Sequence, residues 1–128
     1  MNEEMKKEKL FKDGYKNFKE MNYFEAHEVW EELWSDYYLK DRKFVQGLIQ
    51  LAVSFVHLGN GNMKGAVNQL KKCTEKFEQF SGIHREINVP LLLDQIEQVR
   101  KKYNKCRHVS DFDWTIVPVS YTHLTLPT

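Results

Sequence analysis

The 128-residue chain has no long uninterrupted apolar segment. The longest mostly apolar stretch, Phe44 to Leu58, is broken by glutamine, serine and histidine, so it falls short of the ~20 apolar residues that a membrane-spanning helix needs. Met1 to Leu10 is mostly lysine and glutamate and lacks the apolar core of a secretory signal. We therefore expect a cytoplasmic protein that does not bind or cross a membrane.

Cysteine and charge of one sign are also scarce. Cys73 and Cys106 lie far apart and form no C-x-x-C motif, so we expect one buried small residue and one surface thiol rather than a disulfide. The net charge is only +1, and no basic patch interleaved with aromatic residues is evident, so no nucleic-acid partner is expected. Phosphate-binding loops, nucleophile elbows and dinucleotide fingerprints are absent, which excludes the enzyme classes that depend on those motifs.

What the chain does contain is helical periodicity. Apolar residues recur at a spacing of three and four in five segments, approximately residues 4–21, 23–38, 42–58, 62–80 and 89–105. The third segment is apolar nearly all round, which is typical of a central, buried helix. Length and composition fit one soluble domain over residues 1–118. The predicted fold is all-α, a compact antiparallel bundle of about five helices joined by short connections.

Polar residues before each helical segment predict where the helices begin. The predicted N-caps are Asn22 (with Glu25 three residues later), Asp41, Asn62, and Asn88 followed by Pro90. Ser81-Gly82 is expected to stop the fourth helix. After the fifth helix, residues 108–118 have no helical period, and we expect Phe112 and Trp114 to pack onto the bundle.

The last ten residues differ from the rest of the chain. Residues 119–128 carry no charge, although the preceding segment is rich in it. They resemble the in-frame translation of a transposase adapter used to prepare sequencing libraries. We therefore interpret 119–128 as read-through rather than native protein and exclude it from the fold.

Two predicted helices carry polar residues beside their apolar stripes. On a helical wheel, His27, Glu31 and Trp34 border the apolar stripe of the second helix, with Glu28 just beyond. Gln46, Gln50 and His57 form a narrow stripe on the third. A buried amide without a partner costs ~1–3 kcal/mol, so these groups need partners, and antiparallel packing could bring them together. The candidate polar cluster is therefore His27, Glu28, Glu31, Gln46, Gln50 and His57.

Three interpretations of this polar cluster remain open. It could be a structural network that fixes the helix register. It could belong to a pocket for an unknown small molecule or protein partner, with Trp30, Trp34 and Tyr37 in its wall. It could also serve a metal-dependent or acid–base enzyme through His27, Glu28, Glu31 and His57. Whether the chain is an enzyme is not decided by the sequence.

The metal interpretation fits the motifs poorly. His27 to Glu31 resembles H-E-x-x-H, but a glutamate stands where the second histidine belongs. Only His27, Glu31 and His57 could supply three ligands, if their helices converge. We therefore predict neither a metal site nor a cofactor. His84 and His108 are expected to be exposed to solvent.

The run from Tyr23 to Trp34, followed by Phe44 to Ala52, His57 and Gly59 to Ala66, resembles domain of unknown function 309. The resemblance extends from about Leu10 to Lys102 and implies a small helical fold of bacterial or archaeal origin, with no assigned activity. The motif residues that carry over are Glu25, His27, Glu28, Trp30, Glu31, Trp34, Gln46, Gly47, Gln50 and His57.

Two further expectations concern close contacts. Gly47 has no side chain, so we expect it to let the second helix approach the third, beneath Trp30 or Trp34. A small helical bundle can also bury a spare apolar face against a second copy, so a homodimer is compatible with the sequence.

Overall fold

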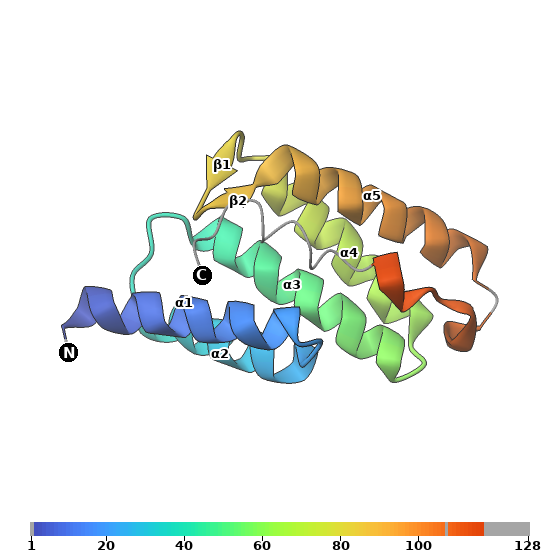
Figure 1. Ribbon diagram of the computed structural model, residues 1–128, viewed down its shortest axis with the longest axis horizontal. Helices are drawn as coiled ribbons and strands as arrows, with labels where there is room; N and C mark the ends of the chain where they lie inside the picture. The colour runs from blue at the N-terminus through green and yellow to red at the C-terminus, as the bar shows by residue number, and fades with distance from the viewer. Residues whose placement is uncertain (1, 107, 117–128) are drawn as a thin grey trace.

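The computed structural model describes residues 2–106 and 108–116, so the expectation for 119–128 lies outside the described residues. The five predicted helices are confirmed (Figure 1). They are α1 (Glu3–Lys19), α2 (Tyr23–Asp36), α3 (Arg42–Gly59), α4 (Met63–Phe77) and α5 (Val89–Lys105). Within the described ranges, no helix combines the length and apolarity that crossing a bilayer requires.

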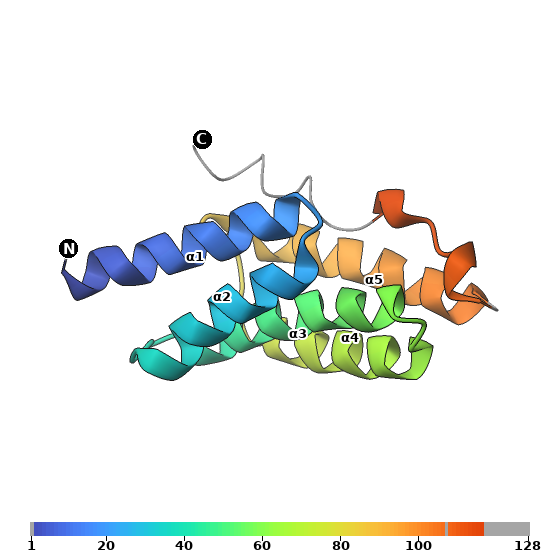
Figure 2. The ribbon, with the colours of Figure 1, turned by 90° about the horizontal axis from the view of Figure 1, so that it is seen from below.

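Helix α3 is the centre of the bundle. Ten of its 18 residues are buried, in keeping with its nearly continuous apolar sequence. It packs against α2 on one side and α4 on the other, α1 packs on α2, and α5 lies along α4 (Figures 1 and 2). The first turn of α2 and the last turn of α3 therefore lie at the side of the bundle where α1 turns into α2.

Helices α1 and α2 meet at a glycine. A Cβ at Gly14 would lie 2.3 Å from Trp30 Nε1, so only glycine leaves room for this indole. The indole N–H donates to the Phe11 carbonyl at 3.1 Å, and its burial therefore leaves no unpaired donor. The expectation for Gly47 was wrong, because a Cβ there would meet Phe77 of α4 at 2.9 Å.

Two of the four predicted caps are confirmed. The side chains of Asn62 and Asn88 accept hydrogen bonds from Gly65 N at 2.9 Å and Leu91 N at 3.0 Å. Asn22 and Asp41 stand at the predicted N-cap positions of α2 and α3, but the expectation that their side chains cap these helices was wrong, because neither makes a capping hydrogen bond.

The Asp41 carboxylate is instead bound to a hairpin that the sequence analysis missed. Strands β1 (Ile83–His84) and β2 (Ile87–Asn88) pair antiparallel between α4 and α5. Asp41 Oδ2 accepts from Arg85 Nε at 2.6 Å and from His84 Nε2 at 2.7 Å. Burial alone would raise the pKa of the Asp41 carboxyl, but the hydrogen bonds and positive charge of these partners outweigh it and lower the pKa to about 2.

This contact also corrects the expectation for His84. Its side chain is only 31% exposed, and its ring lies 4.5 Å from that of Phe44 and 4.8 Å from that of Phe80. His108 is exposed, as expected.

The segment after α5 packs onto the bundle as predicted. It forms two short 3₁₀ turns, Val109–Asp111 and Trp114–Ile116. Phe112 is 5% exposed and lies 5.3 Å from the Tyr103 ring, while the Trp114 ring lies 6.2 Å from Phe55. Cys73 is buried, Cys106 is partly buried, and both are free thiols.

Candidate functional site

The α2 members of the predicted polar cluster are oriented by their own helix. His27 Nδ1 donates to the Phe24 carbonyl at 2.7 Å, and its ring meets the Phe24 ring edge-on at 5.1 Å. Glu28 and Glu31 are exposed. None of these three side chains is held by α3.

The α3 members are half-buried. His57 Nδ1 lies 3.4 Å from Asn62 Nδ2, so it contacts the turn before α4. The side-chain oxygen of Gln50 is buried and has no hydrogen-bond partner among the described residues. Gln46 is the third member of the α3 group, and no hydrogen bond of its side chain is found among the described residues. The structure thus brings the α3 members onto one stripe without a hydrogen bond or ion pair to the α2 members.

The same geometry bears on the metal interpretation. Within residues 2–106 and 108–116, no three histidine, cysteine, aspartate or glutamate side chains are grouped so that they could hold a metal ion. His27, Glu31 and His57 therefore do not form the three-ligand site that convergence of their helices would have produced.

The two tryptophans proposed as a pocket wall have different surroundings. Trp30 is 1% exposed and lies in the core. Trp34 is half-buried, donates its indole N–H to the Arg42 carbonyl at 3.1 Å, and has the Arg42 guanidinium 4.1 Å from its ring centre. An arginine stacked on the ring covers one face of this indole.

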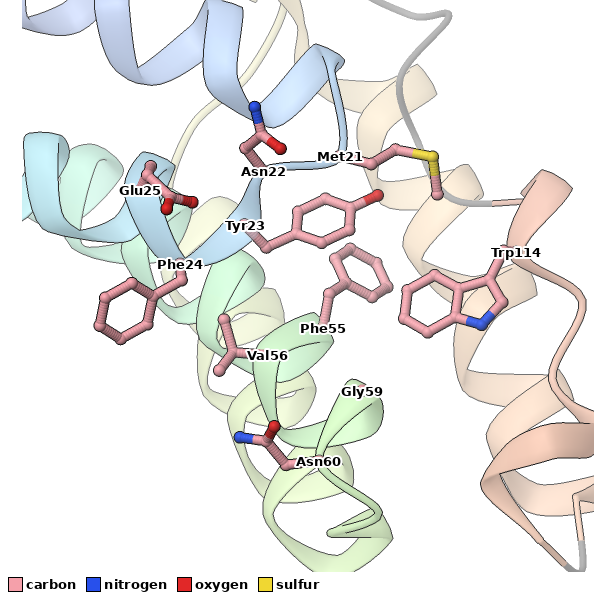
Figure 3. Close-up of a pocket in the computed structure, with 10 residues that line it drawn as sticks. All are labelled: Met21, Asn22, Tyr23, Phe24, Glu25, Phe55, Val56, Gly59, Asn60 and Trp114. Atoms are coloured by element: carbon pink, nitrogen blue, oxygen red, sulfur yellow. The ribbon is translucent and has the colours of Figure 1, made fainter.

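A pocket of roughly 570 Å³ lies elsewhere on α2, where α1 turns into α2 (Figure 3). The end of α3 and the turn that contains Trp114 complete its wall. We call it the aromatic pocket. Its lining residues are Met21, Asn22, Tyr23, Phe24, Glu25, Phe55, Val56, Gly59, Asn60 and Trp114.

Aromatic rings dominate this pocket. The Tyr23 ring lies 5.0 Å from Phe55 and is nearly parallel to Trp114, at 6.2 Å and 20°. Phe24 and Met21 stand at the rim, 52% and 48% exposed. Exposed large apolar side chains beside a hollow are characteristic of binding surfaces, because they gain most from being covered.

The Tyr23 hydroxyl is the most unusual group of the pocket. Tyr23 is 7% exposed, yet its buried hydroxyl has no hydrogen-bond partner among the described residues. Figure 3 shows it directed toward Met21, at the edge of the pocket. Burial raises the pKa of this hydroxyl above its usual range, so it stays neutral and available as a donor. A buried polar group without a partner costs about 1–3 kcal/mol.

The turn that carries Met21 is also under strain. Met21 has φ of 65°, in the left-handed region that favours glycine, and the following amide, Asn22 N, bonds to the Asn17 carbonyl at 2.8 Å. The first helix was predicted to continue through Met21, because Met21 lies three residues after Phe18 and so continues the apolar period. The left-handed turn instead points the chain into α2 and leaves the thioether at the pocket rim (Figure 3).

Of the residues that line this pocket, Glu25 was predicted from the sequence as a motif residue, whereas the others were not predicted to form a site. Tyr23 and Phe24 lie in the first turn of α2, where their positions in the sequence indicate only the edge of an apolar stripe. Trp114 was expected only to pack on the bundle. The available signal was the pair Met21 and Phe24, two large apolar residues on either side of a predicted helix start.

Comparison with known proteins agrees with the motif-based resemblance. Residues 11–69 match the family described as Domain of unknown function (DUF309). The match confirms the resemblance across the segment from α1 into α4, and that family's description assigns no activity. No curated protein and no solved structure matches the chain. Within the aromatic pocket, only Trp114 lies outside the matched segment.

Proposed function

We propose that the chain is a ligand-binding domain and that the aromatic pocket is its binding site. One observation carries the proposal: the Tyr23 hydroxyl, in the wall of an open pocket, is buried without a hydrogen-bond partner among the described residues. Proteins rarely keep such groups without a role, because phenylalanine at the same position would avoid the cost. A ligand that accepts a hydrogen bond would offset this cost when it binds.

The lining defines the chemistry of the ligand. Phe24, Val56 and Trp114 favour an aromatic or branched aliphatic group, since their burial by a ligand removes apolar surface from water. Asn22 and Asn60 are exposed residues of the pocket lining, and their side-chain amides can orient a polar end of the ligand. The ligand is thus an apolar group that also carries a hydrogen-bond acceptor.

The polar cluster predicted from the sequence remains a second proposed contact surface. The buried side-chain oxygen of Gln50 supports this role, because it has no hydrogen-bond partner in the part of the chain that the structure describes. Acid–base chemistry by His27, Glu28 and Glu31 would require these side chains to converge with the α3 stripe. We also propose a cytoplasmic, bacterial setting, supported by the two free thiols and by the family resemblance.

Nuclear magnetic resonance of the three indole N–H groups tests the pocket. Acetophenone is the probe, and α-methylstyrene is the matched control without the carbonyl. Acetophenone should shift the Trp114 signal and leave the signals of Trp30 and Trp34 unchanged, because both of those N–H groups are bound to backbone carbonyls. No shift at Trp114, or an equal shift at Trp34, would contradict the proposal.

Two variants separate the pocket from the hydroxyl. Val56→Phe fills the pocket and should abolish the Trp114 shift with either probe. Tyr23→Phe should remove the preference for acetophenone over α-methylstyrene while leaving stability unchanged or higher, because the buried hydroxyl is lost. A clear loss of stability in Tyr23→Phe would show that the hydroxyl has a structural partner.

A further inference from the structure

Helix α2 carries acidic charge that no ion pair among the described residues neutralises. Its 14 residues include five carboxylates and no lysine or arginine. All five are exposed, and none forms an ion pair within the described part of the chain. The five carboxylates are Glu25, Glu28, Glu31, Glu32 and Asp36.

Four of these carboxylates share one face. At 100° per residue, Glu25, Glu28, Glu32 and Asp36 fall within about 80° of the helix circumference. We call this set the acidic stripe. Neighbours three or four residues apart repel each other by ~0.2–0.5 kcal/mol per pair, and Asp36 also opposes the helix dipole at the last turn. The arrangement therefore lowers the stability of α2 while the protein is free.

The acidic stripe runs into the aromatic pocket. Glu25 belongs to both, and Phe24, exposed at the pocket rim, precedes it in the sequence. The pocket supplies an observation independent of charge: Tyr23 is more than nine-tenths buried, and its hydroxyl has no hydrogen-bond partner in residues 2–106 and 108–116. An apolar hollow with a polar group in its wall thus continues directly into a row of carboxylates.

We propose that the acidic stripe and the aromatic pocket together dock a basic segment of a partner polypeptide. This inference rests on the proposed function of the pocket. An apolar side chain of the partner enters the pocket, its backbone carbonyl accepts from the Tyr23 hydroxyl, and lysine or arginine residues follow along α2 toward Asp36. Charge complementarity of this kind increases the association rate and fixes the direction of the bound chain.

The length of the stripe favours a polypeptide over a small ligand. From Glu25 to Asp36 the helix rises by about 16 Å, a distance that roughly five residues of extended chain cover. Alternate residues of an extended chain point to the same side about 6.5–7 Å apart, so lysines at every second position can place cations on successive turns of α2, which rise by about 5.4 Å. Nucleic acid does not fit, because its phosphates would be repelled by the stripe.

Fluorescence anisotropy with synthetic peptides tests the proposal. The probe is a labelled peptide with one leucine followed by alternating lysine and glycine. One matched peptide has glutamate in place of lysine, and another has serine in place of leucine. The lysine–leucine peptide should bind most tightly, and its affinity should fall as salt is added.

Two variants with the same change of charge show whether the stripe itself is recognised. Glu28→Lys with Glu32→Lys should weaken binding of the lysine–leucine peptide by about tenfold or more. Glu75→Lys with Glu78→Lys changes two exposed carboxylates of the α4 end that form no ion pair within the described residues, and should change affinity by less than about twofold. Equal weakening by both, or no binding by the unaltered protein, would overturn the docking proposal.

The Val56→Phe variant distinguishes this inference from the proposed function. If Val56→Phe and the leucine-to-serine peptide weaken binding while the stripe variant does not, the pocket stands and the basic partner is wrong. If the stripe variant weakens binding but neither of those changes does, the pocket has no role in docking and the apolar anchor is wrong, while the acetophenone shift of Trp114 decides the proposed function separately.

Discussion

Helices α1 and α2 are neighbours of similar length, but their exposed charges are arranged in opposite ways. In α1, lysine and acidic residues alternate one turn apart, as in the pairs Lys9–Asp13 at 3.0 Å and Lys12–Glu8 at 3.6 Å. Glu3 and Glu4 lie in its first turn and Lys16 and Lys19 in its last, which suits the helix dipole. Helix α2 has charge of one sign and an aspartate in its last turn.

The difference indicates which helix surface is complete within the monomer. All four acidic residues of α1 form ion pairs with lysines of their own helix, so that surface has no unpaired carboxylate. The surface of α2 is stabilised only from its buried side, by Ala26, Trp30 and Leu33. An outward face that contributes no stability of its own is free to serve binding.

The largest effect is expected where the two helices touch. Gly14→Ala should lower the free energy of unfolding by about 2–3 kcal/mol, because its Cβ would overlap the buried Trp30 indole. Gly59→Ala adds the same methyl group where nothing lies within 4 Å, and should be neutral or slightly stabilising. Urea unfolding of both variants measures the difference, and equal stabilities would show that the α1–α2 contact can adjust.

Lowering the pH should reduce the stability that comes from Asp41, the paired carboxylate that follows α2, and the unpaired carboxylates of α2 have no such contribution to lose. The pKa of Asp41 is lowered from 3.8 to about 2 by Arg85 and His84, so the contribution of Asp41 is complete above its unfolded pKa and is lost as pH falls through about 4 to 2. The loss amounts to up to about 2 kcal/mol.

The matched measurement is the difference in stability between the natural chain and Asp41→Asn across that pH range. The difference should shrink as the solution becomes more acidic, because protonation removes the same charge that the substitution removes. A difference that stays constant from neutral pH to pH 2 would mean that the Asp41 contact does not depend on its charge.

The smallest effect has opposite signs in the two helices. Lys12→Gln in α1 should destabilise the protein by about 0.3 kcal/mol, because it breaks a surface ion pair. Glu28→Gln in α2 should stabilise it by a similar amount, because it removes like-charge repulsion. Thermal melts at low ionic strength measure both changes, and added salt should reduce them. A loss of stability in Glu28→Gln would indicate that this carboxylate has a partner.

The helices could be predicted because their signal is local. Periodic apolar residues define each segment, and Asn62 and Asn88 cap the helices that directly follow them. The Asp41 prediction failed for a physical reason that local sequence does not contain: an arginine 44 residues away binds the same carboxylate. The hairpin was missed because its turn residues, Arg85 and Glu86, have positive φ without the usual glycine or asparagine.

The candidate site was only partly predictable for a related reason. The wheel places His27 and Glu31 on one border of α2, but which helix faces that border depends on packing angles that the sequence does not specify. The glycine contact shows the same limit, since Gly47 faces Phe77 and it is Gly14 that lies against Trp30. Trp114 joins the pocket across a long separation in sequence, from a segment without a period.

The connection between α2 and α3 has a consequence for the order of folding. Trp34 and Arg42 are joined by two hydrogen bonds, each from a side chain to a backbone carbonyl. The Trp34 indole N–H donates to the Arg42 carbonyl, and the Arg42 guanidinium donates to the Trp34 carbonyl at 3.2 Å. The two residues are only eight positions apart, so the loop between them can close within ~10–100 ns, far faster than contacts with α5 can be sampled. We therefore expect the α2–α3 connection to form early in folding, before contacts with α5.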